Sequence, residues 1–117
     1  MKKYLEKVKE IAESLDWNVN IDESYVYFQT YSSAGQDFNM AINIEDTPDE
    51  FCQAVNRYYE SFDCSQEAYY WLDNTGHGIN GAPYEMVDVY KDMEECEEEI
   101  YKLWFKLIEY DWKSEEE

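Results

Sequence analysis

Residues 2–15 show the pattern of an amphipathic helix. Apolar residues recur there at spacings of three and four, with lysines and glutamates between them: Tyr4, Leu5, Val8, Ile11, Ala12 and Leu15. This spacing places the apolar side chains on one face of a helix. Residues 2–16 hold four lysines and four acids, so the predicted helix adds no net charge.

The period changes to two in the next three apolar runs, which cover residues 17–21, 25–31 and 38–44. Successive side chains of a strand point to opposite faces, so this alternation predicts one buried face per strand. The connecting segments, 22–24 and 32–37, are short enough for hairpins. We therefore predict an antiparallel meander of three strands, with one apolar face and one face rich in Asn and Tyr.

Helical spacing returns after Thr47. Pro48 follows this hydroxyl directly and Glu50 stands three residues after it, which is typical of a helix start. Apolar residues at helical spacing then continue to Asp63. Ser65 is predicted to open a second, shorter helix that ends in an Asn-Thr-Gly segment.

The last and longest helix is predicted over residues 84–111. Its inward-facing stripe follows helical spacing: Met86, Val89, Tyr90, Met93, Cys96 or Glu97, Ile100, Leu103, Trp104, Leu107 and Ile108. The order of elements predicts an α+β fold: an N-terminal helix, a three-stranded antiparallel meander, then three helices, with the long acidic C-terminal helix packed on the sheet. We expect a single domain over residues 1–113 and a frayed acidic tail over 114–117.

The charge of the chain is strongly one-signed. Nine Lys and Arg residues stand against 28 Asp and Glu, and 9 − 28 gives a net charge of −19. This excludes direct binding to nucleic acid, because such binding depends on cationic side chains that displace counterions, and it excludes anionic membranes. Aromatic residues make up 18% of the chain and prolines number two, which favours a folded protein over a disordered one.

The cysteines and the first residues of the chain indicate in which cellular compartment the protein is expected. Cys52, Cys64 and Cys96 are odd in number and far apart in the sequence. The first residues include no apolar segment typical of a signal peptide or a membrane span. We therefore expect free thiols and a cytoplasmic protein.

Residues suited to catalysis or metal binding are few. His77 is the only histidine and lies in a glycine-rich segment, residues 76–83. Neither a nucleophile elbow nor a phosphate-binding loop accompanies it, so we expect a loop histidine rather than a proton shuttle. One histidine and three dispersed cysteines do not make a zinc site, and the carboxylates lack calcium-loop spacing. No enzyme activity, cofactor or metal is predicted.

Four acids of the last helix, Asp88, Asp92, Glu95 and Glu99, step by four, three and four residues. This spacing predicts a column of carboxylates facing away from the apolar stripe, about 16 Å long. Further acids flank it at positions 85, 94, 98 and 109. Like charges at this spacing destabilise a helix by roughly 0.2–0.5 kcal/mol per pair, so folding alone does not explain them. The alternative is a solvated face that keeps the protein soluble, for which a net charge of about 2 to 8 would suffice.

A one-signed negative surface on a rigid fold speeds association with a basic partner and can imitate the charges of a nucleic acid. B-DNA carries one charge per roughly 1.7 Å of axis, so closely spaced carboxylates can occupy a cleft built for DNA. The acidity therefore predicts competition with nucleic acid for a basic protein.

In this respect the chain resembles the small, strongly acidic DNA-mimic proteins of phages and mobile elements, the antirestriction and anti-CRISPR inhibitors. The resemblance covers the whole chain diffusely and rests on acids among Tyr and Trp residues: Asp37, Glu45, Asp46, Asp49, Glu50, Glu60, Asp63, Glu67, Asp88, Asp92, Glu94, Glu95, Glu98 and Glu99. Proteins of this type bind restriction or Cas nucleases and block access to DNA without being enzymes. The resemblance implies that the protein acts in the cytoplasm of a bacterial host cell.

We predict a non-enzymatic inhibitor of a host defence nuclease, a CRISPR-Cas effector or a restriction enzyme, that occupies its positively charged nucleic-acid-binding cleft as a DNA mimic. The predicted partner-binding residues are Asp37, Glu45, Asp46, Asp49, Glu50, Asp88, Asp92, Glu94, Glu95, Glu98 and Glu99. The alternative is an acidic immunity-type or adaptor protein that neutralises a basic partner without imitating nucleic acid. An enzyme using His77 and an acidic housekeeping domain are further alternatives.

Self-association is a separate expectation. A homodimer is predicted if the tyrosine and asparagine face of the sheet, or the aromatic end of the last helix, is exposed, because large apolar patches usually mark contacts.

Overall fold

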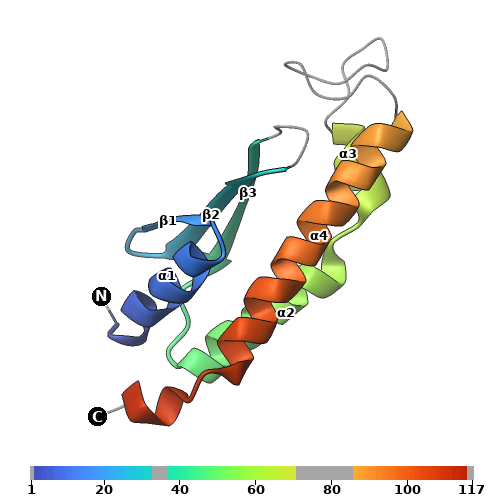
Figure 1. Ribbon diagram of the computed structural model, residues 1–117. Helices are drawn as coiled ribbons and strands as arrows, with labels where there is room; N and C mark the ends of the chain where they lie inside the picture. The colour runs from blue at the N-terminus through green and yellow to red at the C-terminus, as the bar shows by residue number, and fades with distance from the viewer. Residues whose placement is uncertain (1, 33–36, 71–85, 116–117) are drawn as a thin grey trace.

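The computed structural model describes residues 2–32, 37–70 and 86–115. Its elements in chain order are α1 (Tyr4–Ser14), β1 (Asn18–Ile21), β2 (Tyr25–Tyr31), β3 (Asp37–Asn43), α2 (Pro48–Ser61), α3 (Cys64–Tyr70), α4 (Met86–Glu109) and a 3-10 helix, η2 (Trp112–Glu115) (Figure 1). The predicted α+β layout is confirmed. The predicted end of the second short helix and the segment with His77 lie outside the described residues.

A tight helix end joins α1 to the sheet. Asp16 adopts a left-handed backbone conformation, with φ of 70°. The N–H of Trp17 donates to Ala12 at 3.0 Å and the N–H of Asp16 donates to Glu13 at 3.1 Å, so the last carbonyl groups of the helix are satisfied. This reversal brings Trp17 into the core, where it is 2% exposed.

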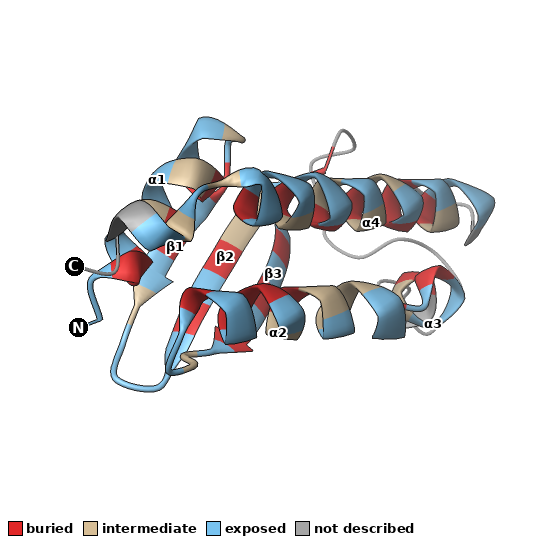
Figure 2. Cartoon of the chain, turned by 90° about the horizontal axis from the view of Figure 1, so that it is seen from below, coloured by how far each residue is buried: buried red, intermediate tan, exposed pale blue. Residues whose placement is uncertain are grey.

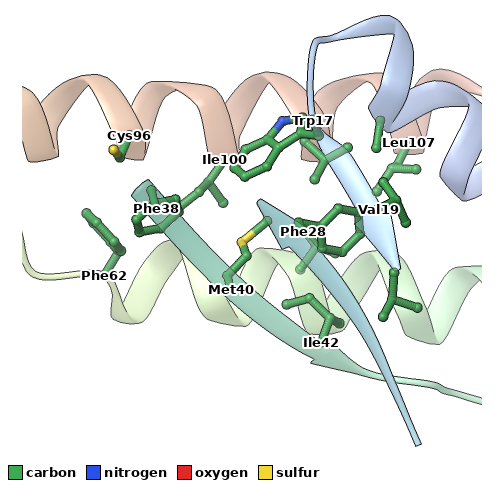
Figure 3. Packing of buried hydrophobic residues seen from close by; sticks show 14 of the residues in the cluster. Trp17, Val19, Phe28, Phe38, Met40, Ile42, Phe62, Cys96, Ile100 and Leu107 are labelled. Carbon is green, nitrogen blue, oxygen red and sulfur yellow. The ribbon is translucent and has the colours of Figure 1, made fainter. Parts of the chain in front are cut away.

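The sheet is an antiparallel meander in the order β1-β2-β3, as predicted. Val19 pairs with Phe28, and Phe28 pairs with Met40, so the apolar positions of all three strands share one face. Among the described elements, α1, α2 and α4 lie on this side of the sheet, and Figure 3 shows the strand side chains pointing between α2 and α4. The opposite face carries the exposed Asn and Tyr side chains.

Side-chain caps open α2 and α3. The Thr47 hydroxyl accepts the N–H of Glu50 at 3.1 Å, which confirms the predicted start of α2. The carboxylate of Asp63 accepts the N–H groups of Ser65 and Gln66 at 3.0 and 3.2 Å. The cap of α3 is therefore Asp63, and the prediction that Ser65 opens this helix was wrong by two positions.

The core is one continuous cluster between the sheet and the helices. The predicted stripe of α4 is buried at its centre, with these residues 0–1% exposed: Val89, Met93, Cys96, Ile100, Leu103 and Leu107. Figure 2 shows the buried positions of α2 and α4 on their facing sides. The molecule is elongated, with extents of 54 × 22 × 21 Å, because α4 runs past the end of the sheet (Figure 1).

Part of the segment expected to be a frayed tail, residues 114–117, falls within the described residues. Ser114 and Glu115 belong to η2, and residues 116–117 lie outside the described part. Trp112 anchors this turn, since its Nε1–H donates to the carbonyl oxygen of Leu107 at 2.7 Å. Its ring also packs edge-on against Tyr4, with ring centroids 6.4 Å apart.

Candidate functional site

The acids of α4 do not form a single exposed column. Asp88, Glu94 and Glu98 are exposed, whereas Glu95 and Glu99 are half-buried. Glu99 also forms an ion pair with Lys102, with 3.4 Å between carboxylate and ammonium. The exposed acids of the helix therefore include Asp88 from the predicted column and the flanking Glu94 and Glu98, and the rest of the column faces partly inward.

Asp92 contradicts the predicted outward orientation most clearly. It is 5% exposed, and its carboxylate oxygen Oδ2 accepts the hydroxyl proton of Ser32 at 2.6 Å. The bond joins residues 60 positions apart and ties the end of β2 to α4. The short distance is typical of a hydroxyl bound to a carboxylate. In this conformation Asp92 is inaccessible to a partner, so it holds the fold together rather than presenting charge.

The helical period explains why Asp92 is buried. Position 92 lies three residues after Val89 and four before Cys96, and both of these residues are buried. Residues at such spacings share one helix face, so Asp92 belongs to the edge of the apolar stripe. This signal was present in the sequence. Ser32, which looks like an ordinary turn residue in the sequence, becomes recognisable as its partner only in the tertiary structure.

A group of carboxylates surrounds the junction of α2, α3 and α4 near Cys64. Burial raises the pKa of the Cys64 thiol to about 11, and the negative charges of Glu97, Glu94 and Asp63 add to this shift. Burial and repulsion from Asp63 also raise the pKa of the half-buried Glu67. Because α3 packs against α4, Asp63 at the start of α3 and Glu67 within it lie beside the acids of α4.

We call this surface the acidic ridge and define it by five residues: Asp63, Glu67, Glu94, Glu97 and Glu98. None of them forms an ion pair with a residue in the described part of the chain; the ion pairs found there involve Asp46, Glu10, Glu99 and Glu109 instead. The ridge therefore presents negative charge that no described lysine or arginine neutralises.

Four other predicted residues form a second group at the start of α2: Glu45, Asp46, Asp49 and Glu50. Burial raises the pKa of the Tyr4 hydroxyl to about 12, and the neighbouring acids act in the same direction. The hydroxyl donates to the carbonyl oxygen of Glu45 at 2.6 Å. Lys2 lies 3.7 Å from Asp46 and offsets part of this charge. The 14-residue α2 separates this group from the acidic ridge by about 20 Å.

Asp37 lies apart from both groups, on the open face of the sheet. Its carboxylate accepts the side-chain amides of Gln29 and Asn39 at 2.8 and 3.0 Å. The structure thus distributes the predicted partner-binding residues over three places and buries one of them. Tyr25, Tyr27 and Tyr31 are exposed on the same face, which meets one condition for the predicted homodimer; dimerisation itself stays a prediction.

An aromatic patch adjoins the ridge on α2 and α4. Its members are Tyr59, Tyr101, Trp104, Phe105 and Ile108, and Tyr101, Phe105 and Ile108 are 42–44% exposed. The ring of Tyr101 lies 5.5 Å from that of Tyr59 and 6.2 Å from that of Phe105 between centroids. The exposed face of α4 therefore changes along its length from carboxylates to aromatic rings.

The thiols are poorly suited to nucleophilic chemistry. Cys52, Cys64 and Cys96 are free and buried. Burial raises the pKa of Cys52 to about 11 and that of Cys96 to about 12, so little reactive thiolate exists at neutral pH. Among the described residues, no three potential ligands gather as a metal site would require.

Comparisons of the chain with protein-family models, curated proteins and solved structures found no match. Within the described ranges, a helix suited to crossing a membrane is also absent. The family resemblance and the choice of partner therefore remain predictions.

Proposed function

We propose that this protein is a non-enzymatic inhibitor of a host defence nuclease, a CRISPR-Cas effector or a restriction enzyme. It binds the positively charged nucleic-acid cleft of that nuclease as a DNA mimic and blocks access of the nucleic acid. The observation that carries the proposal is the acidic ridge, five carboxylates on α3, its cap and α4 that have no ion-pair partner among the described residues.

The position of the charge favours mimicry over solubility. Carboxylates on a rigid pair of helices keep fixed spacings, as phosphates on a duplex do, and an unneutralised array attracts a basic cleft at long range. The second acidic group lies about 20 Å away along α2, so the two groups together extend the array along the long axis of the molecule. A solubilising surface requires neither fixed spacing nor clustering.

The first experiment captures the partner. The immobilised protein is exposed to a lysate of bacteria that contain restriction and CRISPR nucleases, and the bound partner is challenged with duplex DNA or guide RNA. A captured nuclease that nucleic acid displaces supports the proposal. A basic partner that nucleic acid does not displace contradicts mimicry, and capture of no basic partner contradicts inhibition by charge.

A charge-reversal pair then tests the surface. Glu94→Lys combined with Glu98→Lys reverses the exposed centre of the ridge and should abolish nuclease inhibition. The matched control, Glu6→Lys with Glu13→Lys, changes the net charge equally on the exposed side of α1. If both pairs weaken inhibition alike, total charge rather than the ridge carries the effect.

The aromatic patch favours a second candidate function, an immunity-type protein that binds a basic partner outside its nucleic-acid cleft. Buried aromatic contacts are typical of protein interfaces, and phosphate mimicry does not need them. Under this alternative, Tyr101→Ala with Phe105→Ala should weaken binding more than the lysine pair on the ridge does. Nucleic acid should then fail to compete with the protein.

A further inference from the structure

The outer edge of β3 is an unpaired strand edge. Tyr25 is opposite Asn43 in the sheet, and the carbonyl oxygen of Tyr25 accepts the N–H of Asp22, on the side away from β3. The neighbouring pair, Ser24 and Ile44, is a hydrogen-bonded pair, because the N–H of Ile44 donates to the carbonyl oxygen of Ser24 at 3.0 Å. In an antiparallel pair these two arrangements alternate. The backbone N–H and C=O groups of Asn43 and of every second residue before it therefore point outward.

These outward groups belong to Asp37, Asn39, Ala41 and Asn43. No described backbone group outside the sheet pairs with them. Natural edge strands are protected by short length, lysine, proline or a bulge. β1, the opposite edge, has only four residues, whereas β3 has seven, pairs without a bulge, and contains neither lysine nor proline. The β3 edge is thus suited to accept another strand.

A groove runs beside this edge, between β3 and α2. Its volume is about 370 Å³, and its lining includes Ile42, Ala54, Tyr58, Arg57 and the acidic Glu45. A strand added to β3 would direct every second side chain into this groove, because side chains alternate between the two faces of a sheet. The apolar part of the groove suits an aliphatic side chain, Arg57 provides one positive charge, and Glu45 provides one negative charge.

Arg57 is an isolated cation. It is the only lysine or arginine in residues 17–72, which contain ten acids. Its side chain is exposed and forms no hydrogen bond or ion pair with any described residue. A guanidinium group presents a planar fork of donors that matches a carboxylate. Glu45 lines the same groove but forms no ion pair with Arg57 among the described residues, so the guanidinium is open to a carboxylate supplied from outside.

A second copy of the chain fits this edge poorly. Pairing β3 with itself about a two-fold axis would join two chains that each carry a net charge of −19, and these chains repel one another. We propose that the β3 edge binds an extended peptide segment of another protein as a fourth strand, with one carboxylate of that segment bound to Arg57. This binding mode is independent of the acidic ridge.

A library of random linear peptides displayed on phage tests the proposal on the full-length protein. The enriched sequences should alternate apolar residues with polar ones and carry an Asp or Glu two residues from an apolar side chain. Synthetic copies of these peptides should lose affinity by about tenfold or more on Arg57→Glu, because a charge-assisted pair is replaced by repulsion. Arg57→Lys should lose less.

A backbone variant separates strand addition from simple charge attraction. Ala41→Pro removes one outward N–H group without removing a bond to β2, and proline is tolerated on the solvent side of an edge strand. It should weaken binding, while Ala41→Thr, which keeps the N–H, should not. Circular dichroism of each variant checks that the fold is retained. If Ala41→Pro fails to fold, Arg57→Glu still tests the proposal, because it does not alter the backbone.

Several outcomes would overturn the proposal. These are selection of peptides without acidic residues, binding that neither Arg57→Glu nor Ala41→Pro weakens, and enrichment of no peptide at all. A dimer in analytical ultracentrifugation that Ala41→Pro dissociates would identify a second copy as the occupant instead. Because no nuclease takes part in these measurements, their failure is distinguishable from failure of the DNA-mimic proposal.

Discussion

The helices α1 and α4 have the same amphipathic pattern, but α1 buries no charged residue whereas α4 buries one. In α1 the buried positions are all uncharged, and the half-buried Lys7 forms an ion pair at 3.2 Å with the exposed Glu10. In α4 eight acids stand against three lysines, and one acid, Asp92, is buried. α4 is the central helix, since it packs against α1, α2 and α3. A helix with neighbours on several sides buries the margins of its apolar stripe, and a charge at such a margin acquires a structural role.

The sharpest test of this contrast reverses one charge on each helix. Asp92→Lys should lower the free energy of unfolding by about 3–5 kcal/mol, because it places an ammonium group where Ser32 donates to a carboxylate. Glu13→Lys on the exposed side of α1 should change it by less than about 0.5 kcal/mol. Urea denaturation measures both values. Equal effects would show that Asp92 is accessible after all.

Removing the other partner of this bond should have a smaller effect. Ser32→Ala leaves the buried carboxylate without the hydroxyl donor and should destabilise the fold by about 1–3 kcal/mol. Ser61→Ala is the matched control, since the Ser61 hydroxyl donates to Tyr58 at an exposed position. In a double-mutant cycle with Asp92→Ala, the coupling energy should exceed about 0.5 kcal/mol. Additive effects would contradict a direct interaction.

Charge reversal on the exposed side of α4 should raise the free energy of unfolding, whereas Asp92→Lys and Ser32→Ala should lower it. Glu94→Lys with Glu98→Lys relieves repulsion within the acidic ridge and should stabilise the protein by about 0.5 kcal/mol at low salt. The gain should shrink as salt screens the charges. The matched pair on α1, Glu6→Lys with Glu13→Lys, should give no such gain because lysines already balance those acids. Loss of stability in the ridge variant would mean that its acids have stabilising partners.

The smallest expected effect concerns the pH dependence of Glu67. Burial and the charge of Asp63 raise the pKa of this carboxyl above its ordinary value of 4.5 in the folded state. Below pH 4.5 the side chain is protonated in both the folded and the unfolded state and does not lower the free energy of unfolding. As the pH rises through the pKa of the folded state, ionisation destabilises the fold. Glu67→Gln should therefore stabilise the protein slightly at neutral pH and not in acid. Urea titrations at the two pH values measure the difference, and a variant less stable than the parent at neutral pH would contradict this.

Local patterns were enough to predict most of the elements. Thr47 and Pro48 identify the start of α2 because the cap uses neighbouring residues only. The period of two predicts β2 with the bounds that the structure shows, Tyr25–Tyr31, because one face of the sheet is buried and the other is exposed. The start of α3 was missed because Asp63 and Ser65 are both good caps, and the choice between them depends on where α2 ends.

The candidate site was predicted less well than the fold. The identity of the acids and their excess were evident from the sequence, yet their accessibility was not, as Asp92 shows. The convergence of Asp63 and Glu67 with the acids of α4 also needed the structure, because α3 and its cap are far from α4 in the sequence. The aromatic patch arises in the same way, when Tyr59 of α2 meets Tyr101 of α4.

By itself, the sequence determined the periodic elements, the α+β order and the large negative charge, because these depend on neighbouring residues and on simple totals. The tertiary structure decided which charges are available to a partner. Burial depends on what packs against each face of a helix, and for Asp92 that is Ser32, 60 residues away. The tertiary structure also makes β3 an edge strand, because the edges of a sheet depend on the order of its strands.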